Sequence, residues 1–170
     1  MNYIEHYHND ALEFDYWGED LISPAELRRN QFIYQLCPVK PHQKVLDIGS
    51  GRGWFSLHCA QIGAEVTAID LSAENLKRIK QTDPQIRTIY GDACNLNLAG
   101  ESFDLIVAME VWEHLVDPVL AINNWKKLLP PGGTLFVTVP YKEVIRYSLC
   151  IHCNRKTPVN AHLHSWDIPN

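Results

Sequence analysis

The sequence has little of what marks exported, membrane-spanning or nucleic-acid-binding proteins. None of its apolar runs approaches the ~20 residues that a membrane-spanning helix needs. Residues 1–10 carry acidic side chains and histidines where a secretory signal would have a basic stretch and then an apolar one. Acidic residues outnumber basic ones by 20 to 15, a net charge of −5 that argues against a generic binder of phosphate backbones. We therefore expect a soluble chain with no membrane or nucleic-acid partner.

Cysteine usage argues against a disulfide framework. The chain has five cysteines, an odd number. Cys37, Cys59 and Cys94 stand singly in apolar surroundings, as reduced thiols do in cytosolic proteins. We expect a cytoplasmic location. With 170 residues, 46% of them hydrophobic, the chain is long enough for one sizeable core.

Three regions differ in pattern along the chain. Residues 1–22 show no clean period and are interpreted as an irregular N-terminal arm or lid. Residues 23–141 form the predicted core, which opens with a helix from the Ser23-Pro24-Ala25-Glu26 start signal to about Leu36. Residues 142–170 form a tail that contains cysteine and histidine.

From Lys44 onward, short β-type runs alternate with helical stretches, which is typical of parallel strands joined by crossover helices. The predicted strands are Lys44–Ile48, Glu65–Ile69, Ile86–Tyr90, Phe103–Ala108 and Thr134–Val139. The predicted helices are Trp54–Gln61, Ala73–Gln81 behind a Ser72 cap, and Pro118–Leu129 behind Asp117, the last with Val119, Ile122, Trp125 and Leu129 on one face. The fold class is α/β, with a Rossmann-like, doubly wound, mostly parallel sheet of about five strands.

A glycine loop follows the first predicted strand and precedes a helix. Its G-x-G-x-G spacing, Gly49 to Gly53, lets a ligand approach the backbone closely. A dinucleotide-binding loop would have Gly or Ala where Trp54 stands, so nicotinamide cofactors are disfavoured.

Five motifs in order resemble class I S-adenosylmethionine-dependent methyltransferases, of the small-molecule type with Glu-x-x-Glu-His. They are Leu46-Asp47-Ile48-Gly49-Ser50-Gly51-Arg52-Gly53, the strand ending in Asp70-Leu71, Gly91-Asp92-Ala93, the segment Phe103 to Leu115, and Leu128 to Leu135. The resemblance implies strand order 3-2-1-4-5 and an enzyme that uses S-adenosylmethionine. It implies cofactor contacts at Asp47, Gly49, Ser50, Gly51, Asp70, Leu71, Asp92, Ala93 and Met109.

The roles implied for these residues differ along the cofactor. Asp47 and the glycines would hold the methionine end of the cofactor. Asp70 would accept hydrogen bonds from both ribose hydroxyls, and Asp92 would bond the adenine amino group. Plain turn or capping roles remain as alternatives for Asp70 and Asp92. The function predicted is transfer of a methyl group to an oxygen, nitrogen or carbon of a small-molecule acceptor by in-line displacement.

His114 is the candidate catalytic base, because it follows the fourth strand at the lip of the predicted site. A structural histidine that bonds a backbone carbonyl is the competing interpretation. In a less favoured hypothesis, a divalent cation is bound by Glu110, Glu113 and His114.

The tail combines Cys150-x-x-Cys153 with His162-x-His164. This spacing allows a zinc site on these four residues, but unliganded cysteines are preferred and no metal is predicted. The tail also resembles an insertion after the fifth strand of some related methyltransferases, with Asn154 replacing the usual Gly.

Related enzymes continue through a further helix and an antiparallel hairpin of the main sheet, so we expect a fragment that lacks this final hairpin. An inactive cofactor-binding module with a Cys/His interaction surface is the alternative function. The sequence does not indicate the oligomeric state.

Overall fold

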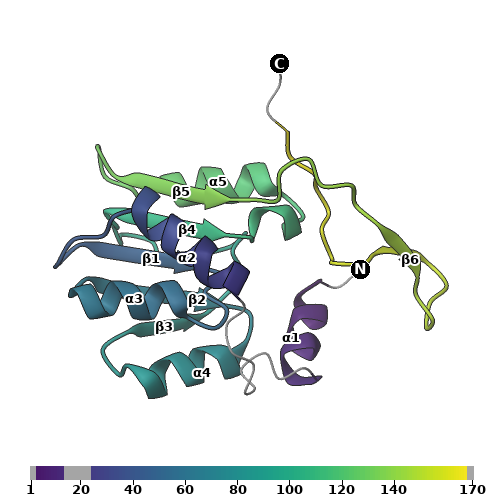
Figure 1. The fold of residues 1–170 in the computed structure, drawn as a ribbon, viewed down its shortest axis with the longest axis horizontal. Helices are drawn as coiled ribbons and strands as arrows, with labels where there is room; N and C mark the ends of the chain where they lie inside the picture. Colours follow the sequence, from purple (N-terminus) through teal and green to yellow (C-terminus); the bar gives the residue numbers. More distant parts are fainter. Residues whose placement is uncertain (1–2, 14–23, 168–170) are drawn as a thin grey trace.

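The computed structural model describes residues 3–13 and 24–167. Its helices and strands follow one another as an α/β chain (Figure 1). In order they are α1 (Tyr3–Glu13), α2 (Pro24–Leu36), β1 (Lys44–Ile48), α3 (Trp54–Ile62), β2 (Glu65–Asp70), α4 (Ala73–Thr82), β3 (Arg87–Tyr90), β4 (Leu105–Met109), the 3-10 turn η1 (Trp112–His114), α5 (Pro118–Lys126), β5 (Thr134–Thr138), β6 (Tyr147–Leu149) and β7 (Lys156–Pro158).

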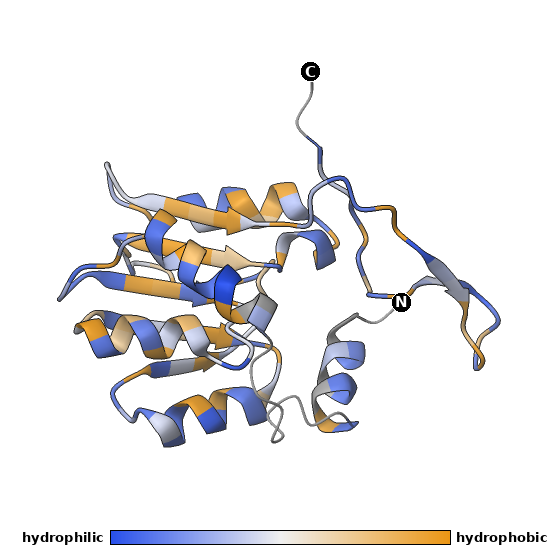
Figure 2. Ribbon diagram, viewed as in Figure 1, coloured by the Kyte–Doolittle hydropathy of each residue, from blue (hydrophilic) through white to orange (hydrophobic). Residues whose placement is uncertain are grey.

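The main sheet has five parallel strands in the order β3-β2-β1-β4-β5, which confirms the predicted fold class and strand order. The bounds of β1 agree with the prediction at both ends, and those of the other four strands differ by one or two residues. Strands that are covered on both faces have short apolar runs in their sequence. Figure 2 shows these apolar residues along the strands of the sheet.

Helices cover both faces of the sheet, and each face has its own core. One core contains Ile33 of α2 with Cys37 just after that helix, Phe55 of α3 and Ile79 of α4, packed on one side of the strands. The other contains Trp125 of α5 and residues of the loop after β3. Because both faces are covered, the strand ends are where the sheet can receive a ligand.

The start of α5 follows the predicted capping chemistry, but its buried face differs. The Asp117 carboxylate accepts from the Leu120 N–H at 2.8 Å, and Pro118 occupies the first turn. The buried side chains are Pro118, Ala121 and Trp125, whereas Val119 is 66% exposed. The predicted face was therefore wrong at Val119, because the position of Trp125 sets the rotation of the helix and Val119 lies off that face.

The N-terminal region also departs from the prediction. Residues Tyr3–Glu13 form helix α1, where an irregular arm was predicted, and α1 lies close to α4. The predicted Ser23 cap lies outside the described residues.

The tail leaves β5 and returns toward the strand ends (Figure 1). Strands β6 and β7 pair with each other as a separate antiparallel hairpin and are not hydrogen-bonded to the main sheet. Trp166 then forms a bridge with Tyr141, so the segment closes on its own start. Within residues 3–13 and 24–167, no helix has the length and apolarity needed to cross a bilayer.

We expect Trp125→Phe to destabilise the fold by about 1–3 kcal/mol. The fully buried indole donates its Nε1–H to the Ala93 carbonyl at 2.8 Å, so the change leaves a buried acceptor unpaired. Urea unfolding followed by circular dichroism would measure the loss. An unchanged unfolding midpoint would contradict this role for the hydrogen bond.

Candidate functional site

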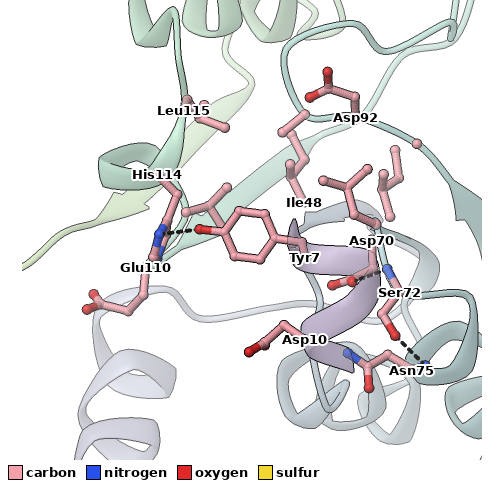
Figure 3. A pocket seen from close by; sticks show the side chains of 16 residues that line it. Tyr7, Asp10, Ile48, Asp70, Ser72, Asn75, Asp92, Glu110, His114 and Leu115 are labelled. Carbon is pink, nitrogen blue, oxygen red and sulfur yellow. Dashed lines mark hydrogen bonds between the residues drawn. The ribbon is translucent and has the colours of Figure 1, made fainter. Parts of the chain in front are cut away.

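A cavity of about 230 Å³ opens at the carboxyl ends of the parallel strands. Its wall is built from the residues that follow β1, β2, β3 and β4, with α1 adding Tyr7 and Asp10 (Figure 3). Open parallel sheets bind ligands at this edge, beside the point where the strand order reverses. Here β1 is that point, since β2 and β4 flank it.

The glycine loop after β1 is tied to β2 by its backbone. The Ser50 N–H donates to the Ile69 carbonyl at 3.0 Å, and the Gly51 N–H donates to Asp70 Oδ2 at 2.7 Å. Gly49 has φ +66° and a Cβ there would lie 2.4 Å from Val111 Cγ2, so both the turn and the close approach require glycine.

Asp70 ends β2 with its side chain at the cavity (Figure 3). Oδ1 accepts from the Ser72 N–H at 2.7 Å, while Oδ2 accepts from Gly51. Burial raises the pKa of Asp70, and the backbone N–H bonds oppose that rise. The Leu71 N–H and the Asn75 side chain also hydrogen-bond this carboxylate, so the group is fixed in place at the cavity.

The predicted cofactor residues divide into two sets. Those that line the cavity are Gly49, Asp70, Leu71, Asp92 and Ala93. Those that do not are Asp47, Ser50, Gly51 and Met109. Ser50 and Gly51 instead shape the loop, and Met109 packs against the core beside α3.

Asp47 is buried beneath the site, where its Oδ2 accepts from the Ser56 hydroxyl of α3 at 2.6 Å. Burial raises its pKa to about 7, which the Ser56 bond partly offsets. The side chain therefore joins β1 to α3.

His114 also lines the cavity, at the end of η1. Its Nδ1 and the Tyr7 hydroxyl share a hydrogen bond of 2.5 Å, which brings α1 against η1 (Figure 3). Burial and the neighbouring His162 lower the pKa of His114 to about 4. Sequence reasoning missed Tyr7, because only the docking of α1 brings it to His114, 107 residues away.

The tail returns to the same turn. The Leu163 N–H donates to the Glu113 carbonyl at 2.8 Å, and His164 Nε2–H donates to the Leu115 carbonyl at 2.9 Å. Trp166 stacks on Trp112 with ring centroids 3.9 Å apart. The tail thus covers η1.

The tail does not assemble the zinc site that the spacing allowed. Within the described part of the chain, the potential metal ligands that gather are Glu113, His114 and His162, without Cys150 or Cys153. Of the other predicted cation ligands, Glu110 is separately engaged, because its Oε1 accepts from the Thr138 hydroxyl at 2.8 Å. Sequence reasoning missed His162 as a neighbour of Glu113.

A parallel sheet in this order, with a glycine loop after its first strand and an acid at the end of its second, defines a Rossmann-like ligand-binding class. The methyltransferase-domain family matches residues 46–137, more than half of the chain. The chain therefore belongs to this family.

Curated relatives include "Ubiquinone biosynthesis O-methyltransferase" of Xanthomonas campestris pv. campestris, 37% identical over 116 residues, which are 65% of this chain and 48% of that protein. The same-named protein of Xanthomonas oryzae pv. oryzae is 36% identical over 113 residues, 64% of this chain and 47% of that protein. The chain spans about half the length of these relatives.

Solved structures share the fold. An S-adenosylmethionine-dependent methyltransferase from Mesorhizobium loti has a TM-score of 0.62 at 22% identity, over 75% of this chain and 62% of that one. Coclaurine N-methyltransferase bound to N-methylheliamine and SAH has a TM-score of 0.62 at 23% identity, over 73% of this chain and 38% of that one. This chain has the class I methyltransferase fold.

The buried Asp47 predicts a pH dependence of stability. Its folded pKa of about 7 lies above the unfolded value, so its contribution to stability is complete below about pH 4 and is lost as the pH rises through 7. As the pH rises over this range, the free energy of unfolding should fall less in Asp47→Asn than in the wild type. The difference between the two should be up to about 4 kcal/mol. Urea titrations at a series of pH values would measure it. Asp104→Asn, at an exposed position, is the control, and equal slopes for wild type and Asp47→Asn would contradict the prediction.

Gly49→Ala should destabilise the protein by about 1–3 kcal/mol more than Gly132→Ala. Both glycines have positive φ, so both alanine variants carry backbone strain. Only at Gly49 would the added Cβ also press on Val111, because no atom lies within 4 Å of a Cβ at Gly132. Thermal and urea unfolding of the two variants would be compared. Equal losses would mean that Val111 moves aside freely.

Proposed function

We propose that this chain binds S-adenosylmethionine in the cavity and takes part in transfer of its methyl group to a small-molecule acceptor. The observation that carries the proposal is the position of Asp70. Its carboxylate is held by two backbone N–H groups at the end of β2, beside the glycine loop and facing the cavity. Membership of the methyltransferase-domain family supports the same activity.

The cavity residues suggest how the cofactor would lie. Asp70 would accept from the two ribose hydroxyls, since a carboxylate makes strong bidentate bonds. The loop at Gly49 would meet the methionine end, where the backbone is open to close approach. Asp92 would bond the adenine amino group, with Leu71 and Ala93 beside the ring, because all three line the cavity next to Asp70.

The acceptor would approach from the side of Glu110 and His114. The adenosine residues occupy the β2 and β3 side of the cavity, which leaves the η1 side for the acceptor. The acceptor atom would form a bond to the methyl carbon as the carbon–sulfur bond breaks, an acceptor O–H or N–H would release its proton to solvent, and S-adenosylhomocysteine would leave. The protein's part is to align the two reactants. We assign His114 to the acceptor end of the site.

The acceptor is proposed to be a small molecule, because the curated relatives are named for O-methylation in ubiquinone biosynthesis. Coclaurine N-methyltransferase, which shares the fold, is likewise named for a small molecule. The acidic balance of the chain fits this better than a nucleic-acid acceptor.

Calorimetric titration with S-adenosylhomocysteine tests the cofactor. We expect selective binding over NADH, and binding weakened about 10- to 100-fold in Asp70→Asn, which keeps the shape but loses the charge that strengthens the bonds. Asp104→Asn is the matched control, because Asp104 also accepts a backbone N–H, from Lys44 at 2.9 Å, at the opposite end of the sheet.

Unchanged affinity in a folded Asp70→Asn sample would refute the ribose assignment. Turnover is tested separately, by following S-adenosylhomocysteine release with phenolic and amine acceptors. Binding without release across the panel would favour the alternative of an inactive cofactor-binding module.

A further inference from the structure

Glu113 is a carboxylic acid buried in η1. Its exposed fraction is 0%, and within residues 3–13 and 24–167 neither carboxylate oxygen has a hydrogen-bond partner. His114 Nε2 lies 3.9 Å from Oε1, too far for a hydrogen bond. Buried polar side chains are almost always paired, so an unpaired carboxylate here calls for a ligand.

His162 reaches this carboxylate from the tail. Its Nδ1–H donates to Glu143 Oε2 at 2.5 Å, which leaves the lone pair on Nε2. The tail is held here by the backbone bond from Leu163 to Glu113. The ring centroids of His114 and His162 are 4.6 Å apart.

We propose that Glu113, His114 and His162 bind a divalent transition-metal ion, with zinc as the best match. One donor atom from each residue lies within 4.8 Å of the other two. Zinc ligands at about 2.1 Å stand roughly 3.4 Å apart in a tetrahedron, so the donors would close by up to about 1.4 Å. Rotation of the two imidazole rings can supply much of that movement.

The donor set selects the class of metal. Two imidazoles and one carboxylate suit zinc and neighbouring first-row ions, whereas magnesium and calcium prefer oxygen ligands throughout. A carboxylate on the far nitrogen of a metal-binding histidine is a common arrangement, and Glu143 occupies that position on His162. The Tyr7 hydroxyl lies on Nδ1 of His114, and its oxygen would accept the proton of that nitrogen when Nε2 binds the metal.

The metal would lie where the methyl acceptor is proposed to bind, and this role for the metal rests on the proposed function. Three protein ligands leave a fourth position, and His114 lines the cavity, so an oxygen of the acceptor can complete the coordination. The metal would use the lone pair that a base needs, so His114 acts as a ligand here and not as a proton acceptor.

The test is calorimetric titration of the chelator-treated chain with zinc chloride. We expect one ion per chain. Glu143→Gln should weaken zinc binding by about 10- to 100-fold, because it removes only the support of His162. His162→Ala and the isosteric Glu113→Gln should weaken it more. His164→Ala is the matched control, since that ring bonds the Leu115 carbonyl in the same segment.

A second experiment tests whether Cys150 and Cys153 bind the zinc instead of this site. A Cys150→Ser/Cys153→Ser variant should keep full zinc affinity, and cobalt substituted for zinc should show no thiolate-to-cobalt charge-transfer absorption. Loss of binding in the cysteine variant with retention in His162→Ala would overturn the proposal. So would the absence of stoichiometric binding by a folded wild-type sample.

Titration of the same samples with S-adenosylhomocysteine distinguishes the two proposals. Cofactor binding without zinc binding would refute the metal site alone. Zinc binding without cofactor binding would refute the proposed function and leave the metal site standing.

Discussion

The parallel pairing of β1 with β2 is the constraint on which the site depends. Their register runs from Lys44 opposite Glu65 to Ile48 opposite Ile69, so the next residues along each strand, Gly49 and Asp70, emerge level with each other. A shift by one residue would turn Asp70 toward the other face of the sheet. The bond from Gly51 to Asp70 then locks the loop in that register, and the cavity forms beside it.

Buried acids surround this edge of the sheet. Asp47 and Glu113 have their pKa values raised to about 7 by burial, and burial raises that of Asp70 as well. Each would be more easily accommodated as a neutral side chain of the same size. Perturbed acids gather where a protein binds or reacts, and these three lie in or next to the cavity. The ionised forms of these acids therefore oppose folding at the edge of the sheet where the candidate site lies.

Local sequence signals predicted much of this arrangement. Short windows of sequence encode the strands, the Ser72 and Asp117 caps, the acid that ends β2 and the acid that follows β3, because apolar runs, turn residues and capping side chains act on their neighbours. Asp47 shows the limit: the motif ties it to the cofactor, but the packing of α3 gives it Ser56 as partner. Helix α1 was missed because its turns are stabilised by docking and not by a clear apolar period.

Several contacts that sequence spacing could not predict converge on η1. Tyr7 arrives from α1 and His162 from the tail, so His114 stands between the two ends of the described chain. Spacing allowed, without favouring it, a zinc site that joins His162 and His164 to the cysteines, but the path of the tail gives the two histidines different partners, Glu143 and the Leu115 carbonyl. Because α1 and the tail meet at one histidine, a ligand bound there would contact both at once.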